Sequence, residues 1–116
     1  MNDLIQEWVL KGEEDWRSAQ VLLRDDLPLV TPALFHLQQC AEKLLKALLI
    51  KRNVRFERRH DLSYLLRLAS ENELSCHSHI LNQLNPFAVE IRYPGDLPQF
   101  SVSEARQFRR SRSSNY

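Results

Sequence analysis

Apolar residues recur at steps of three and four along nearly the whole chain, the spacing that places side chains on one face of an α-helix. The 116 residues include only two glycines and few β-branched residues, so no β-strand is predicted. The length suits one domain with one hydrophobic core. We therefore expect an all-α fold, an up-and-down bundle of about five helices, with a single domain over residues 1–110 and a disordered basic tail over residues 111–116.

Two long helices are predicted in the first half of the chain. The first starts near Asn2 or Asp3, and its apolar face includes Gly12, where another helix can approach closely. The second covers about residues 32–52, with Thr31 as the N-cap and a proline in the first turn. Because this second helix is apolar on more than one face, we expect it at the centre of the bundle.

Capping signals predict two shorter helices. Asp61 is the expected N-cap of the third helix, which begins near His60. Ser101 and Glu104 have the spacing of a capping box, in which each side chain bonds the backbone N–H of the other residue. They predict a short fifth helix near the end of the chain.

The fourth predicted helix covers about residues 75–91 and is kinked near Asn82, because Pro86 removes a backbone donor. Its apolar side chains alternate at three- and four-residue steps, as in the contact line between paired helices. With the two tryptophans of the first helix, they leave more apolar surface than one small core hides, so we expect a homodimer. The residues of this expected seam are Leu81, Leu84, Ala88 and Ile91.

Charge and cysteine content exclude several classes of protein. The formal net charge of +1 is too small for a general electrostatic grip on nucleic acid or membrane, so any polyanion contact is local. Cys40 and Cys76 lack a CxxC or Cys/His ligand spacing and are expected to be reduced thiols in a cytoplasmic protein. The acidic N-terminus does not fit a secretory signal. No metal and no cofactor are expected.

The chain resembles the HEPN family in stretches that together span nearly its whole length. The first helix carries Trp8, Asp15, Trp16 and Ala19, and the second carries the run from Leu37 to Leu49, LQQCAEKLLKALL. His60-Asp61-Leu62 with Leu65-Leu66, and Arg92-Tyr93-Pro94, complete the pattern. The combination is more specific than any one of its parts.

The resemblance implies a dimer-forming helical module that acts with a minimal nucleotidyltransferase, in some cases as a toxin-antitoxin unit. Members of the wider superfamily cleave RNA with an Arg and a His that follows it one or two helical turns later. Here all four histidines precede Arg92 in the chain, so this pair is absent at the expected place. We therefore lean away from an enzyme.

One polar pocket is the candidate ligand site. Gln39, Glu42 and Lys46 on the second helix are expected to converge with His60 and Arg92 and to hold a phosphate or a base, and Tyr93 is placed to stack on the base. The alternatives are a solvated stripe with an i,i+4 ion pair, an Arg92 paired with a helix carboxylate, and a Tyr93 that closes the core. The ligand site and these structural alternatives all stay open.

Three functions follow from these observations. The first is a nucleotide- or nucleic-acid-associated module that acts with a nucleotidyltransferase partner. The second is a metal-independent RNA endonuclease, a toxin, that uses Arg92 at a dimer cleft with help from His60. The third is a structural adaptor without a ligand. The basic loop of Arg55, Arg58 and Arg59 is a further place where RNA or an acidic partner can bind.

Overall fold

The computed structural model describes residues 3–74, 78–88 and 98–111, and every regular element among them is helical. This confirms the expected all-α fold. The elements are α1 (Asp3–Arg24), α2 (Val30–Lys51), α3 (Leu62–Glu71), α4 (Ser78–Leu81), the 3-10 helix η1 (Asn82–Ala88) and α5 (Val102–Ser111). Residues 112–116 of the expected tail lie outside the described residues.

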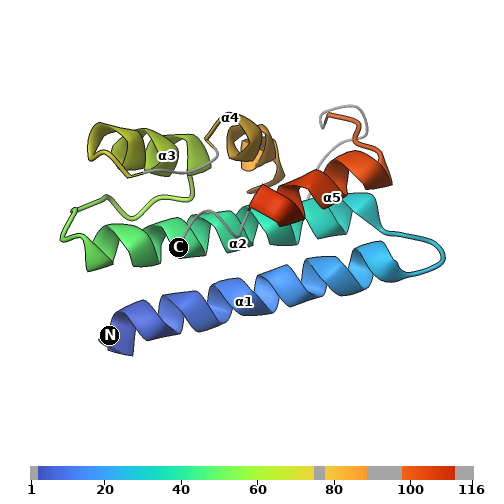
Figure 1. Cartoon of the computed structure of the whole chain (residues 1–116), viewed down its shortest axis with the longest axis horizontal. Helices are drawn as coiled ribbons and strands as arrows, with labels where there is room; N and C mark the ends of the chain where they lie inside the picture. The colour runs from blue at the N-terminus through green and yellow to red at the C-terminus, as the bar shows by residue number, and fades with distance from the viewer. Residues whose placement is uncertain (1–2, 75–77, 89–97, 112–116) are drawn as a thin grey trace.

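Helix α2 lies at the centre of the molecule, as its apolar faces predicted. Antiparallel α1 covers one side of α2, and α3, α4 and α5 lie on the other side (Figure 1). Leu45 and Leu49 of α2 are fully buried in the core that it shares with these helices. None of the described helices is long and apolar enough to span a lipid bilayer.

The close approach expected at Gly12 is confirmed. A Cβ atom at Gly12 would lie 3.0 Å from Cδ2 and 3.1 Å from Cγ of the Leu44 side chain. This spacing is tighter than ordinary van der Waals contact, so only glycine fits here without movement of the buried Leu44. Helices α1 and α2 therefore approach each other closely at Gly12, on the face that also carries charged residues.

Of the helix caps predicted at Thr31, Asp61 and Ser101, the last two are confirmed and the first is wrong. Asp61 Oδ1 accepts the Tyr64 N–H at 3.1 Å, and Ser101 and Glu104 exchange side chain to backbone bonds of 3.0 and 3.1 Å. Helix α2, however, has Leu29 as its N-cap and no side-chain cap bond. The Leu29 N–H donates to Leu22 O at 3.0 Å, so the loop closes by a backbone bond and the helix begins before Thr31.

The fourth helix differs from the prediction of one long kinked α-helix. A four-residue α4 changes into the 3-10 helix η1 at Asn82, the residue where the kink was expected. Pro86 lies inside η1 and has no N–H to continue an α-helical ladder. Asn85 Oδ1 accepts the Leu62 N–H at 2.8 Å, which anchors η1 to the start of α3. Residues 75–77 and 89–91 of the predicted helix lie outside the described residues.

The apolar seam predicted for a homodimer is part of the core of the single chain. Leu81 and Leu84 are buried in the same cluster as Leu45 of α2 and Phe87 of η1. Ile91 lies outside the described residues. These leucines are therefore not free to contact a second copy, and a homodimer requires another surface.

Candidate functional site

A buried carboxylate of α2 is the centre of the candidate site. Glu42 Oε1 accepts from Lys46 Nζ at 3.0 Å, and Glu42 Oε2 accepts from Gln38 Nε2 at 2.9 Å. Residues four apart lie on one helix face, which is why the sequence spacing already paired Glu42 with Lys46. The side chains of this pair are only 3% and 6% exposed. The interpretation as a solvated stripe is therefore wrong for Glu42 and Lys46.

His60 joins this pair from the loop that follows α2. Its Nδ1 lies 2.7 Å from Glu42 Oε1, and a carboxylate only accepts hydrogen bonds, so Nδ1 carries the proton. In the neutral ring, Nε2 is then the atom that accepts a proton. The buried carboxylate holds the imidazole in place. Because the His60 side chain is 77% exposed, it remains accessible to a ligand.

The structure brings together three of the six predicted site residues and connects a fourth. Lys46 and His60 each contact Glu42 Oε1. Gln39 is linked to them through Gln38, whose Oε1 accepts from Gln39 Nε2 at 2.7 Å. The two others, Arg92 and Tyr93, lie outside the described residues.

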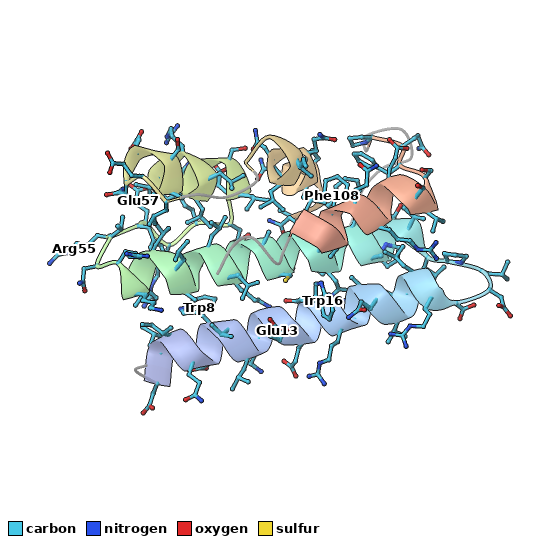
Figure 2. The ribbon with its side chains drawn as sticks, viewed as in Figure 1. Trp8, Glu13, Trp16, Arg55, Glu57 and Phe108 are labelled. Carbon is cyan, nitrogen blue, oxygen red and sulfur yellow. The ribbon has the colours of Figure 1, made fainter. Side chains whose placement is uncertain are left out.

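A pocket of about 480 Å³ opens beside this network, and we refer to it as the Trp8 pocket. It lies where the start of α1, the end of α2 and the following loop meet. Figure 2 labels Trp8 on α1 and Arg55 and Glu57 in that loop. Lys46 Nζ is 5.1 Å from the centroid of the Trp8 ring, within the range of a cation–π contact. The lining residues are Leu4, Trp8, Lys46, Ile50, Phe56, Arg58, Arg59 and His60.

The sequence interpretation missed the aromatic side of this pocket. Trp8 was counted only as apolar surface of the first helix and as part of the family pattern, and Phe56 lies within a loop that was noted only for its charge. Phe56 stands between Arg55 and Arg58, and an aromatic residue among arginines is itself a signal for binding nucleic acid. Only the contact between α1 and that loop shows that Trp8 faces the same space.

The rim of the Trp8 pocket is held in place by contacts around Arg59. Its guanidinium donates to Asp61 at 2.8 Å and to Glu57 at 3.3 Å, and it lies 4.2 Å from the centroid of the Tyr64 ring. The hydrogen bond from Arg59, together with the Tyr64 N–H, holds the pKa of Asp61 below its usual value. The same carboxylate raises the pKa of Arg59. The loop is therefore anchored at the residue next to His60.

A second charged cluster joins α1 to α2 further along the helix pair. Asp15 accepts from Lys43 Nζ at 2.6 Å and from His36 Nδ1 at 2.9 Å. Its side chain is 11% exposed. This cluster positions α1 against α2 and is separate from the Trp8 pocket. Within the described part of the chain, no group of three or more His, Cys, Asp or Glu side chains is placed to hold a metal ion.

Comparison with known proteins identifies the family. A family model described as the HEPN domain matches residues 5–111. The chain belongs to the HEPN domain family. The match covers nearly the whole chain, and membership supports a nucleic-acid-associated module in general terms. HEPN domains commonly dimerise. No curated protein and no solved structure matches the chain.

Proposed function

We propose that this HEPN domain binds a nucleotide or a short RNA in the Trp8 pocket without cleaving it. The observation that carries the proposal is the position of Lys46, a buried ammonium at the wall of a pocket that also contains aromatic rings. A phosphate needs donors and positive charge, and a base needs a flat apolar surface on which to stack. The Trp8 pocket supplies both.

The groups around the pocket divide the two tasks. Lys46, Arg58 and His60 are the donors that a phosphate would meet, while Trp8 and Phe56 offer rings to a base. Glu42 neutralises part of the charge of Lys46 and fixes its position, so the ammonium is already in place before a ligand arrives. Arg92 and Tyr93 belong to the same proposed site on the strength of the family resemblance.

A minimal nucleotidyltransferase is the proposed partner, and a toxin-antitoxin unit is the proposed context. Both follow from the family resemblance. Co-expression with an adjacent gene product that has a nucleotidyltransferase Gly-Ser motif tests the partner, with the mass of the purified complex as the readout. If both proteins elute only as separate species, this partner is wrong.

Fluorescence anisotropy with a short fluorescein-labelled oligouridylate tests the binding site, with AMP as competitor. Arg58→Ala and Trp8→Ala should each weaken binding about fivefold to tenfold, because one removes a phosphate contact and the other a stacking surface. Arg55→Ala is the matched control, since Arg55 is exposed in the same loop but does not line the pocket. Circular dichroism checks that each variant is folded.

The outcomes of this experiment separate the competing functions. Absence of binding by the wild-type protein would support the structural adaptor. Equal loss in Arg58→Ala and Arg55→Ala would show that the loop acts only through its total charge. Wild-type affinity in Arg92→Ala would remove Arg92 from the site.

A metal-independent RNA endonuclease is the second candidate, and one observation favours it. Glu42 holds the protonated Nδ1 of His60, which leaves Nε2 as the base of an oriented carboxylate–histidine pair. Incubation of labelled RNA with the protein in EDTA separates this function from binding. Cleavage that is lost in both His60→Ala and Arg92→Ala would replace our proposal, whereas a contaminating ribonuclease would be indifferent to both changes.

A further inference from the structure

The Trp8 pocket offers several hydrogen-bond donors and a single side-chain acceptor. Lys46, Arg58 and Arg59 can only donate, and the Trp8 indole has one N–H and no acceptor atom. Apart from His60, the rest of the lining consists of leucine, isoleucine and phenylalanine, which have no polar side-chain atom. Of the described side chains that line the pocket, His60 is therefore the only one that can accept a hydrogen bond.

Glu42 determines which atom of His60 is the acceptor. Because Nδ1 donates to Glu42 Oε1 at 2.7 Å, Nε2 carries the free lone pair of the neutral ring. Glu42 is itself held in place, since Lys46 Nζ and Gln38 Nε2 donate to its two carboxylate oxygens and its side chain is only 3% exposed. The acceptor is therefore oriented before a ligand enters.

This arrangement of donors and one acceptor distinguishes two kinds of phosphate. An internal phosphodiester of RNA has only acceptor oxygens near neutral pH, so it would repel the lone pair of Nε2 unless the ring first took up a proton. A phosphate monoester loses its second proton at about pH 6 and can share that proton with Nε2. Its other oxygens remain free to accept from Lys46 and Arg58.

The size of the pocket fits the same ligand. Its volume of about 480 Å³ lies in the lower part of the range of roughly 300–1,000 Å³ that is typical of small-molecule sites. A pocket of this size suits one nucleotide better than a length of RNA strand. Trp8 and Phe56 provide the rings on which its base can stack.

We propose that the Trp8 pocket is specific for a phosphate monoester carried by a nucleoside, and that His60 selects this monoester over a phosphodiester. The inference rests on the proposed function and narrows its ligand to a free mononucleotide or the phosphorylated end of an RNA. In the complex, the O–H of the monoester donates to His60 Nε2 while Nδ1 keeps its bond to Glu42.

Isothermal titration calorimetry tests this selection with AMP, the 5′-methyl ester of AMP and adenosine, which share one base and one ribose. The titrations are made at about pH 6.5, close to the second ionisation of a phosphate monoester. The wild type should bind AMP about tenfold more tightly than the methyl ester, which is a diester, because one hydrogen bond to a charged group is gained.

His60→Asn separates the two nitrogens of the ring. The asparagine amide can still donate to Glu42, but the shorter side chain places no atom where Nε2 was. The preference for AMP over its methyl ester should fall to less than about twofold, through loss of AMP affinity. His36→Asn is the matched control, because His36 Nδ1 also contacts a buried carboxylate, Asp15 Oδ1, at 2.9 Å and does not line the Trp8 pocket. Circular dichroism checks that both variants are folded.

A second set of titrations identifies what carries the monoester. Oligouridylates of equal length are compared with a phosphate at the 5′ end, at the 3′ end or at neither end. If one phosphorylated form binds about tenfold more tightly than the unphosphorylated form, the ligand is an RNA end. Equal binding of all three, together with the preference for AMP, identifies a free mononucleotide.

The results that contradict the inference differ from those that contradict the proposed function. If the wild type binds none of these ligands, the proposed function fails and the inference fails with it. Equal affinity for AMP and its methyl ester would leave nucleotide binding intact and overturn the selection of a monoester. A preference that persists in His60→Asn would overturn the role of His60. Equal losses of adenosine and AMP affinity in that variant would do the same, since Nε2 would then contact the sugar or the base.

Discussion

At the scale of single residues, the ion pair of Lys46 and Glu42 is the feature with the largest expected effect on stability. Lys46→Met leaves the carboxylate of Glu42 buried without its ammonium partner. Breaking a buried pair in this way costs several kcal/mol, and we expect the free energy of unfolding to fall by about 3 kcal/mol. Urea denaturation followed by circular dichroism measures the change.

The exposed pair of Lys11 and Glu14 provides the control for this prediction. The two side chains lie 3.6 Å apart and are 60% and 59% exposed. Lys11→Met should change the free energy of unfolding by less than about 0.5 kcal/mol. Similar losses for Lys11→Met and Lys46→Met would show that burial does not govern the effect.

At the scale of elements, Asp61 gives the start of α3 a dependence on pH. Its pKa is lower in the folded chain than in the unfolded chain, so its contribution to stability is present above the unfolded pKa of about 3.9 and is lost as the pH falls through the folded pKa. Asp61→Asn keeps a good N-cap and removes the charge. Urea denaturation should show wild type more stable than Asp61→Asn near neutral pH, with the difference shrinking below about pH 4. A difference that stays constant with pH would rule out this role of the Asp61 charge.

The C-terminal end of α3 offers a stabilising change. Glu73 has a φ of 60°, in the left-handed region, and Leu74 N donates to Ala69 O at 2.8 Å in a helix-ending turn. Glycine takes this conformation without a Cβ penalty, so Glu73→Gly should raise the melting temperature and stabilise the fold by about 0.5–1 kcal/mol.

The end of α2 has the same turn and serves as the comparison. Asn53 has a φ of 58°, and asparagine tolerates this region better than glutamate does. Asn53→Gly should therefore stabilise the fold less than Glu73→Gly. A decrease in melting temperature for Glu73→Gly would mean that its side chain contributes more than its backbone conformation costs.

At the scale of the whole molecule, the near-neutral charge limits how RNA can bind. With a net charge of +1, only local clusters such as the Trp8 pocket offer phosphate contacts. A ligand held by about three such contacts should show a slope of about −2 when the logarithm of the binding constant is plotted against that of the salt concentration. Anisotropy titrations at several salt concentrations measure this slope. A much steeper slope would point to a contact surface wider than the Trp8 pocket.

The sequence by itself determined the features that depend on neighbours along the chain. The helical periodicity, the Asp61 cap and the reciprocal bonds of Ser101 and Glu104 act within one turn of a helix, so spacing alone predicts them. The pairing of Glu42 with Lys46 belongs to this class as well, because i,i+4 neighbours meet on any α-helix. The close approach at Gly12 was predictable because a glycine on an apolar helix face leaves room for a second backbone.

Only the tertiary structure decided which of these residues are buried and which distant ones meet. Glu42 and Lys46 are buried, with Lys46 beside the Trp8 ring of α1, and His60 reaches Glu42 because the loop after α2 folds back. Leu81 and Leu84 belong to the core because η1 packs on α2, although their spacing equally suited a seam between copies. Periodicity shows that a face is apolar but not which surface will cover it, because that choice depends on contacts between segments far apart in the chain.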